Sequence, residues 1–113
     1  MMLVQRISDK KMHSSLKSSE EEFSILQVIG DAYFTTILEA IHEIPKSAIE
    51  IYDDTKIPLS TVYRRIQHLH DLGFLQISGT ISSDGKRVFL YKSKVKSLEV
   101  KFDGKLNVKI ELK

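Results

Sequence analysis

The residues best suited to chemistry lie in one short stretch that carries two hydroxyls, a phenol and a guanidinium. Ser60, Thr61, Tyr63 and Arg64 fall within five consecutive positions. Hydroxyl and phenol groups donate hydrogen bonds to phosphate oxygens and so fix the register of a protein on a nucleic acid. Arginine adds a planar fork of donors that matches the two acceptors on a guanine edge. These groups favour binding to a polyanion over bond-making chemistry.

A helix over residues 59–72 is needed to present these groups on one side. Ser60 is expected to cap the start of this helix, and Gly73 suits the residue just after its end. Its apolar residues recur at spacings of four, three and three: Val62, Ile66, Leu69 and Leu72. This periodicity predicts a buried face. The expected packing partners come from earlier in the chain: Ile37, Leu38, Ile41, Ile49 and Ile57.

The polar face of this helix is the candidate reading surface. A helix that enters the DNA major groove contacts base edges mainly with its N-terminal residues. Arg64 is therefore the expected base reader. Arg65 lies toward the core margin and is expected to contact a phosphate or form a surface ion pair, and His68 is expected at the surface, facing a phosphate. The alternative is a solvated face, for which Glu and Lys are more typical than Tyr-Arg-Arg.

Three helical segments are predicted before this one. Ser19 and Glu22 have the spacing of a capping box for a helix through Ile29. Asp31 is expected to cap a second helix, which ends near Pro45. Ser47 is expected to cap a third helix over residues 47–54, and a tight connection follows in which Lys56 takes the turn position where many helix-turn-helix motifs have glycine.

Two hairpins are predicted after Gly73, where the apolar period changes from 3.6 to about 2. The first pairs residues 74–81 with 87–93 around an Asp-Gly loop, from which Lys86 and Arg87 project. The second lies within residues 98–112. A two-residue turn at Asp103-Gly104 would put its apolar sets on opposite faces, so we predict a three-residue loop or a bulge that pairs Phe102 with Leu106.

Composition excludes several classes of function. The 113-residue chain has no cysteine, so disulfides, thiolate nucleophiles and cysteine-ligated zinc are absent. Its four histidines lack metal-site spacing, and no serine, histidine and acid cluster forms a catalytic motif. We expect no enzyme, no metal and no cofactor. No apolar run approaches the roughly 20 residues that a membrane helix needs, so cytoplasmic residence is the expectation.

Charge is divided unevenly along the chain. Residues 1–55 contain 5 Lys and Arg against 10 Asp and Glu, whereas residues 56–113 contain 12 against 5. The net charges of −5 and +7 return the total of +2. A positive excess confined to one half is consistent with a polyanion partner for that half, although a lysine-rich surface is also common among soluble proteins.

The run Leu59-Ser60-Thr61-Val62-Tyr63-Arg64-Arg65-Ile66, with Leu72-Gly73-Phe74-Leu75 and Lys86-Arg87-Val88-Phe89-Leu90-Tyr91, resembles archaeal winged helix-turn-helix transcriptional regulators of the ArsR-like group. The resemblance implies an α+β fold with N-terminal helices, a basic wing at 82–87 and a homodimer. It covers about residues 25–102. Dimerisation is expected through the helix Phe23–Ile29, with the C-terminal hairpin as a further contact. The absent cysteines argue against metal sensing of the ArsR kind.

The expected organisation has three parts. Residues 1–18 are a flexible arm in which Leu3, Val4 and Ile7 offer a short docking piece, residues 19–96 are the DNA-binding domain, and residues 97–113 are a C-terminal hairpin packed on it. The DNA-binding residues are expected to be Ser60, Thr61, Tyr63, Arg64, Arg65, His68, Lys86 and Arg87. The partner is double-stranded DNA, and the location is the nucleoid. The alternative is a winged-helix protein-interaction module that binds no DNA.

Overall fold

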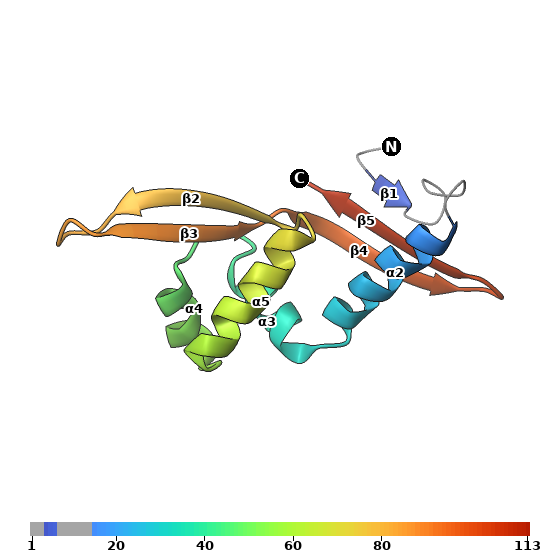
Figure 1. The fold of residues 1–113 in the computed structure, drawn as a ribbon, viewed down its shortest axis with the longest axis horizontal. Coiled ribbons are helices and arrows are strands. Elements are labelled where there is room, and N and C mark those ends of the chain that lie inside the picture. Colours follow the sequence, from blue (N-terminus) through green and yellow to red (C-terminus); the bar gives the residue numbers. More distant parts are fainter. Residues whose placement is uncertain (1–3, 7–14) are drawn as a thin grey trace. The chain divides into compact units, whose positions relative to one another are not determined.

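The computed structural model describes residues 4–6 and 15–113. This part of the chain has an α+β fold, in which four helices are followed by two antiparallel hairpins (Figure 1). The helices are α2 (Ser15–Ile29), α3 (Ala32–Ala40), α4 (Ala48–Thr55) and α5 (Leu59–Asp71). The strands are β1 (Val4–Arg6), β2 (Leu75–Ile81), β3 (Arg87–Ser93), β4 (Val95–Phe102) and β5 (Leu106–Leu112).

The chain divides into two compact units. The central unit is Ala32–Lys94, and the terminal unit joins the described residues up to Asp31 with Val95–Lys113. This division differs from the expected domains, because α2 groups with the C-terminal hairpin and not with the helices that follow it. The terminal unit therefore depends on pairing between the two ends of the chain.

The N-terminal region departs from expectation in two places. The helix begins at Ser15, four residues before the predicted cap, so the predicted capping box of Ser19 and Glu22 is wrong and Glu22 is a buried residue inside α2. Within the expected flexible arm, Val4–Arg6 form a strand that pairs with β5. Leu3 and Ile7, the other expected docking residues, lie outside the described residues.

The core of the central unit lies where α3, α4 and α5 meet. Its fully buried residues come from all three helices: Ile37, Ile51, Val62 and Leu69. Burying each such side chain is worth roughly 1.5–3 kcal/mol, so the apolar periodicity of α5 determines which of its faces packs. The prediction that Ile49 belongs to the core is wrong, because its side chain on α4 is 58% exposed. Ile57, by contrast, is buried as expected.

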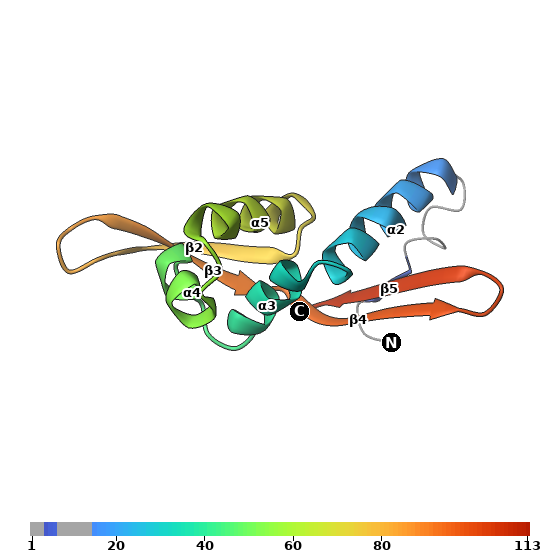
Figure 2. The ribbon, with the colours of Figure 1, turned by 90° about the horizontal axis from the view of Figure 1, so that it is seen from below.

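The hairpin β2–β3 is attached to the helices by the segment before α4. Lys46 forms an isolated antiparallel bridge with Tyr91: each backbone N–H donates to the other residue's carbonyl, at 3.0 and 2.8 Å. The Lys46 ammonium also forms an ion pair with Asp54 at the end of α4. Farther along, the hairpin extends beyond α4 and α5 and leaves its loop projecting (Figure 2). No pattern in the sequence predicts the bridge between Lys46 and Tyr91.

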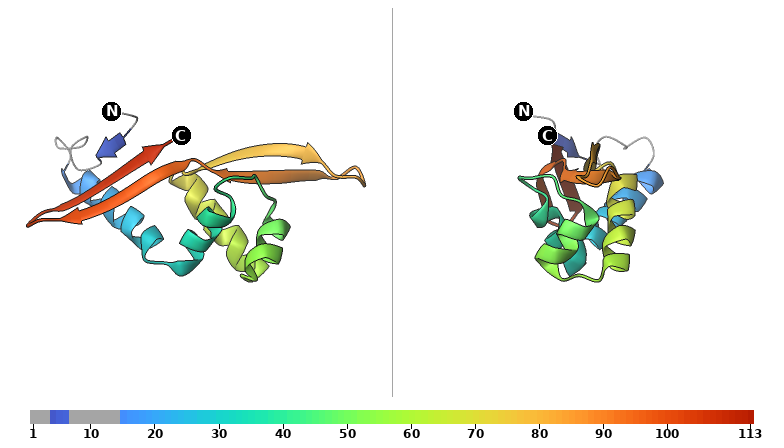
Figure 3. Two further views of the ribbon diagram at one scale, coloured as in Figure 1. Left: turned by 180° about the vertical axis from the view of Figure 1, so that it is seen from behind. Right: turned by 90° about the vertical axis from the view of Figure 1, so that its left-hand side faces the viewer.

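The terminal unit is built on a three-stranded antiparallel sheet with the order β1-β5-β4 (Figure 3). Helix α2 lies on one face of β4 and β5, and the buried apolar side chains are Ile25 and Val28 on α2 with Val108 and Ile110 on β5. A bulge interrupts β4 between Val95 and Ser97. Lys96 at this bulge places its ammonium 3.3 Å from Glu111 on β5.

The predicted register of the second hairpin is confirmed. Phe102 pairs with Leu106 and Val100 with Val108 across a three-residue loop. Gly104 in that loop has φ 87°, a conformation that only glycine adopts without strain. The apolar residues of both strands thus lie on one face, as the alternation of the sequence requires.

Candidate functional site

The connection between α4 and α5 sets the position of the candidate reading helix. Ser47 caps α4 as predicted: its hydroxyl accepts from the Glu50 N–H at 3.2 Å, while the Glu50 carboxylate accepts from the Ser47 N–H at 2.8 Å. At the other end Lys56 takes the left-handed conformation with φ 62°, and its N–H donates to the Tyr52 carbonyl at 2.7 Å. The chain then reverses within three residues and starts α5.

The start of α5 differs from the prediction by one residue. The helix begins at Leu59, and Pro58 occupies the cap position without any side-chain cap. Ser60 is therefore not the cap; it is an exposed residue in the first turn of the helix. Its hydroxyl is available on the polar side of α5 for a contact outside the chain.

The far end of α5 is closed by a Schellman motif. The N–H of Phe74 donates to the Leu69 carbonyl at 3.0 Å, and the N–H of Gly73 donates to the His70 carbonyl at 2.9 Å. Gly73 has φ 82°, so the predicted terminator has the conformation that this motif needs. Phe74 and Leu69 are both buried, which anchors the end of the helix to the core.

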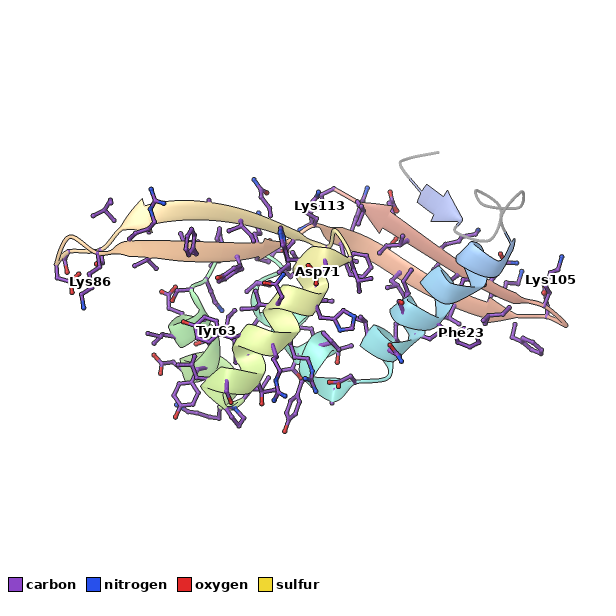
Figure 4. All side chains as sticks on the ribbon, viewed as in Figure 1. Phe23, Tyr63, Asp71, Lys86, Lys105 and Lys113 are labelled. Atoms are coloured by element: carbon purple, nitrogen blue, oxygen red, sulfur yellow. The ribbon has the colours of Figure 1, made fainter. Side chains whose placement is uncertain are left out.

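One stripe of α5 is exposed along the whole helix. It consists of Ser60, Tyr63, Arg64, Gln67 and Asp71. Tyr63 is 51% exposed, and Figure 4 shows it on the N-terminal half of α5, with Asp71 at the opposite end. Gln67 Nε2 donates to Asp71 Oδ1 at 2.9 Å. Gln67 was not among the predicted site residues, although its position three residues after Arg64 indicates the same face.

The other three predicted residues on α5 lie on its flank, and all are half-buried: Thr61, Arg65 and His68. The Arg65 guanidinium lies 5.1 Å from the ring centroid of Phe34 and 5.5 Å from that of Tyr33. His68 meets the Phe34 ring edge-on, with 5.1 Å between centroids. The eight predicted residues therefore separate into an exposed group, the half-buried Thr61, and the pair Arg65 and His68, which contacts Phe34 on α3.

The loop of hairpin β2–β3 is ordered by its own polar groups. The backbone N–H of Ser82 donates to the Lys86 carbonyl at 2.8 Å, and the Lys86 N–H donates to the Ser82 hydroxyl at 3.2 Å. The Ser82 hydroxyl also donates to Asp84, and this bond, with that from the Lys86 backbone, holds the Asp84 pKa below its usual value. Lys86 and Arg87 are both exposed, as predicted.

An open groove of about 700 Å³ is lined by residues of both α5 and the β2–β3 hairpin. Tyr63 of α5 lines it together with Lys86 and Arg87 of the hairpin. Tyr91 also lines the groove. Its partial burial is the main cause that raises the pKa of its phenol, and the nearby Tyr63 raises this pKa further. Two exposed apolar side chains also line the groove: Ile49, which is 58% exposed, and Phe89, which is 50% exposed.

Residues 4–6 and 15–113 contain no group of three or more His, Cys, Asp or Glu side chains that is placed to hold a metal ion. Over the same part of the chain, no helix is long and apolar enough to cross a membrane. No family model, curated protein or solved structure matches the chain.

Proposed function

We propose that the protein is a sequence-specific regulator that binds double-stranded DNA through a winged helix-turn-helix of the ArsR-like archaeal kind. In this proposal α4, the turn at Lys56 and α5 are the helix-turn-helix, and residues 82–87 are the wing. The αL turn and the Schellman end of α5 support the assignment, because they fix the direction and length of a reading helix. Such a regulator would act in the cytoplasm, on the nucleoid.

The observation that carries the proposal is the shared groove of Tyr63, Lys86 and Arg87. A phenol from the helix and two cations from the hairpin line the same surface. Phosphates are contacted by groups of these types, and two separated elements that contact one duplex fix its register. Glu50 also lines the groove, but its carboxylate is already bonded to the Ser47 backbone in the capping box.

The exposed stripe of α5 suggests how roles are divided. Arg64 is the expected base reader, because it is exposed in the N-terminal half of the helix. Ser60 and Thr61 would contact phosphates beside it. Asp71 lies at the opposite end and would repel phosphate, so DNA contact is expected to be confined to the first two turns of α5.

Arg65 and His68 have a smaller role in this proposal than the sequence suggested. Both side chains are engaged with α3 through the ring of Phe34. They would orient α5, and the remaining donors of Arg65 would contact at most one phosphate. The residues expected to dominate affinity are then Tyr63, Arg64, Lys86 and Arg87.

The proposed regulator is a homodimer that joins through α2, with the C-terminal hairpin contributing. Phe23 on α2 is 64% exposed, which supports a partner for that helix (Figure 4). Two copies related by a two-fold axis would bind half-sites one helical turn apart, about 34–36 Å. A single-species monomer in light scattering across a concentration series would contradict the homodimer.

Fluorescence anisotropy with random-sequence duplex DNA at several salt concentrations tests the proposal. Binding should weaken steeply with salt, and a Lys86→Glu/Arg87→Glu double variant should flatten the slope of log affinity against log salt by about 2. Arg64→Ala should cost about 1–3 kcal/mol on a selected target and relax sequence preference. A Lys105→Glu/Lys113→Glu variant is the control, because it makes the same charge change on the terminal unit.

A second candidate function has one observation in its favour. Ile49 and Phe89 place exposed apolar surface in the groove, and such surface suits a protein partner better than a phosphate backbone. This is the winged-helix interaction module without DNA binding. Absence of DNA binding even at low salt, or affinity unchanged in both the Arg64 variant and the wing variant, would replace the DNA proposal with this one.

A further inference from the structure

Strand β4 forms an outer edge of the terminal sheet. The sheet order is β1-β5-β4, so one side of β4 pairs with β5 and, among the described residues, no strand pairs with the other. At eight residues β4 is long for an edge strand. An edge of this kind exposes backbone N–H and C=O groups that readily pair with another chain.

The face of β4 that should be apolar becomes steadily less covered along the strand. Leu98 is half-buried, Val100 is 44% exposed and Phe102 is 74% exposed. The cross-strand partners of the first two, Ile110 and Val108 on β5, are buried. For Leu98 and Val100 the missing cover is therefore at the free edge of the sheet and not beneath it, whereas Phe102 pairs with Leu106, which is itself only half-buried.

The charges on the opposite face of β4 are complementary to themselves. Glu99 and Lys101 lie on either side of Val100. If two β4 strands pair antiparallel about a two-fold axis at Val100, Glu99 of each copy faces Lys101 of the other. Leu98 then faces Phe102 on the apolar side. Opposite charges directly across a pair stabilise it and like charges destabilise it.

The neighbouring symmetric registers lack this complementarity. An axis at Glu99 sets that residue against its own copy, and an axis at Lys101 does the same and also sets Glu99 against Asp103. An axis at Phe102 would put loop residues 103–105 opposite 99–101, next to the axis, so that the strand would lack regular pairs at the centre of the contact. A shift by an odd number of residues would put the apolar face of one copy beside the charged face of the other.

We propose that β4 pairs antiparallel with β4 of a second copy of this chain, with the two-fold axis at Val100, to form a continuous sheet across both copies. The contact is isologous, as a two-fold dimer requires. Helix α2 lies on the same sheet face as Val100 and Phe102, so both α2 helices would flank the shared apolar strip. The pairing defines how the C-terminal hairpin contributes to the proposed homodimer, and in which register, beside the contact through α2.

Charge exchange tests this register on the full chain without DNA. Lys101→Glu sets two glutamates against each other in both equivalent pairs, and Glu99→Lys sets two lysines. Each variant alone should dimerise about tenfold more weakly in sedimentation equilibrium. A mixture of the Lys101→Glu and Glu99→Lys variants should regain the dimer. Positions 99 and 101 are both acidic in the first variant and both basic in the second, so every facing pair again has opposite charges. Lys105→Glu, which changes charge in the loop, should dimerise like the natural chain.

Cross-linking provides a second test that does not depend on charge. The chain has no cysteine, so Val100→Cys introduces a single thiol. Directly opposed residues in an antiparallel pair have Cα atoms about 4.5–5.5 Å apart, which is within disulfide range. Val100→Cys should form a covalent dimer on mild oxidation, whereas Ile81→Cys, at an exposed position on the other unit, should not.

Three results would overturn the proposal: a natural chain that stays monomeric at every concentration, a dimer that both charge reversals leave intact, or a Val100→Cys chain that cross-links no better than Ile81→Cys. The inference specifies the homodimer of the proposed function, and its experiments contain no DNA. Failure here would leave the DNA-binding test standing, and failure of DNA binding would leave the β4 contact standing.

Discussion

Arg65 on α5 lies over the ring of Phe34 on α3, with 5.1 Å between the guanidinium carbon and the ring centroid. The same ring receives His68 from the next turn of α5 at 5.1 Å. Phe34 is 4% exposed and belongs to the core, so the half-buried Arg65 and His68 pack against a buried ring. Two adjacent arginines in the sequence thus differ in kind: Arg64 is exposed to solvent, and Arg65 joins two helices.

Replacing Arg65 by alanine should lower the free energy of unfolding by about 1–2 kcal/mol. The variant loses a partly desolvated cation–π contact and the packing of the arginine stem. Arg64→Ala is the matched control and should stay within about 0.5 kcal/mol, because exposed positions tolerate truncation. Urea unfolding followed by tyrosine fluorescence measures both. Equal effects of the two substitutions would show that the α3 contact contributes nothing to stability.

Replacement by alanine should destabilise the protein at Gly73 but not at Gly79. Gly73 has φ 82° with nothing within 4 Å of an added Cβ, so Gly73→Ala should cost about 1 kcal/mol through backbone strain alone. Gly79 sits in β2 with equally open space and no positive φ, so Gly79→Ala should be neutral or stabilising by up to about 1 kcal/mol. Thermal unfolding monitored by circular dichroism compares them. A destabilised Gly79 variant would mean that the glycine has a role that its conformation does not explain.

Local sequence signals accounted for most of the elements. The capping box at Ser47, the glycine that ends α5 and the register of Phe102 with Leu106 each depend on residues within a few positions of one another. Periodicity also identified the buried face of α5 correctly. These features are predictable because their hydrogen bonds and alternation are set by neighbouring residues.

The departures have causes that lie far apart in the chain. Ile49 fits a helical core pattern, but α4 has only eight residues and its buried side is already supplied by Ala48 and Ile51. The Lys46–Tyr91 bridge joins residues 45 positions apart. The sequence predicts Arg65 at the core margin but not its contact with Phe34, because that ring is on α3 and is not adjacent in sequence. Grouping of α2 with the C-terminal hairpin likewise depends on tertiary packing alone.

Replacing Lys56 by glycine should stabilise the folded protein. Its φ of 62° costs a side chain roughly 1 kcal/mol, and the ammonium recovers part of this by lying 5.6 Å from the Tyr52 ring centroid. Lys56→Ala keeps the backbone strain and loses the ring contact, so it is the control for the side chain. Lys56→Gly should be more stable than Lys56→Ala by about 1 kcal/mol in urea unfolding. Alanine as stable as glycine would mean that the turn relaxes out of the left-handed region.

The hairpin loop should lose order in acid through Asp84. Hydrogen bonds from the Ser82 hydroxyl and the Lys86 backbone lower the pKa of this carboxyl from 3.8. A carboxyl whose pKa is lower in the folded state stabilises the fold above its unfolded pKa, and this stabilisation is lost as pH falls through the folded value. Amide NMR shifts of Gly85 and Lys86 should therefore be constant from neutral pH to about pH 4 and change below it. Asp84→Asn should remove this change, and an Asp84 that titrates above 3.8 would contradict the bonded loop.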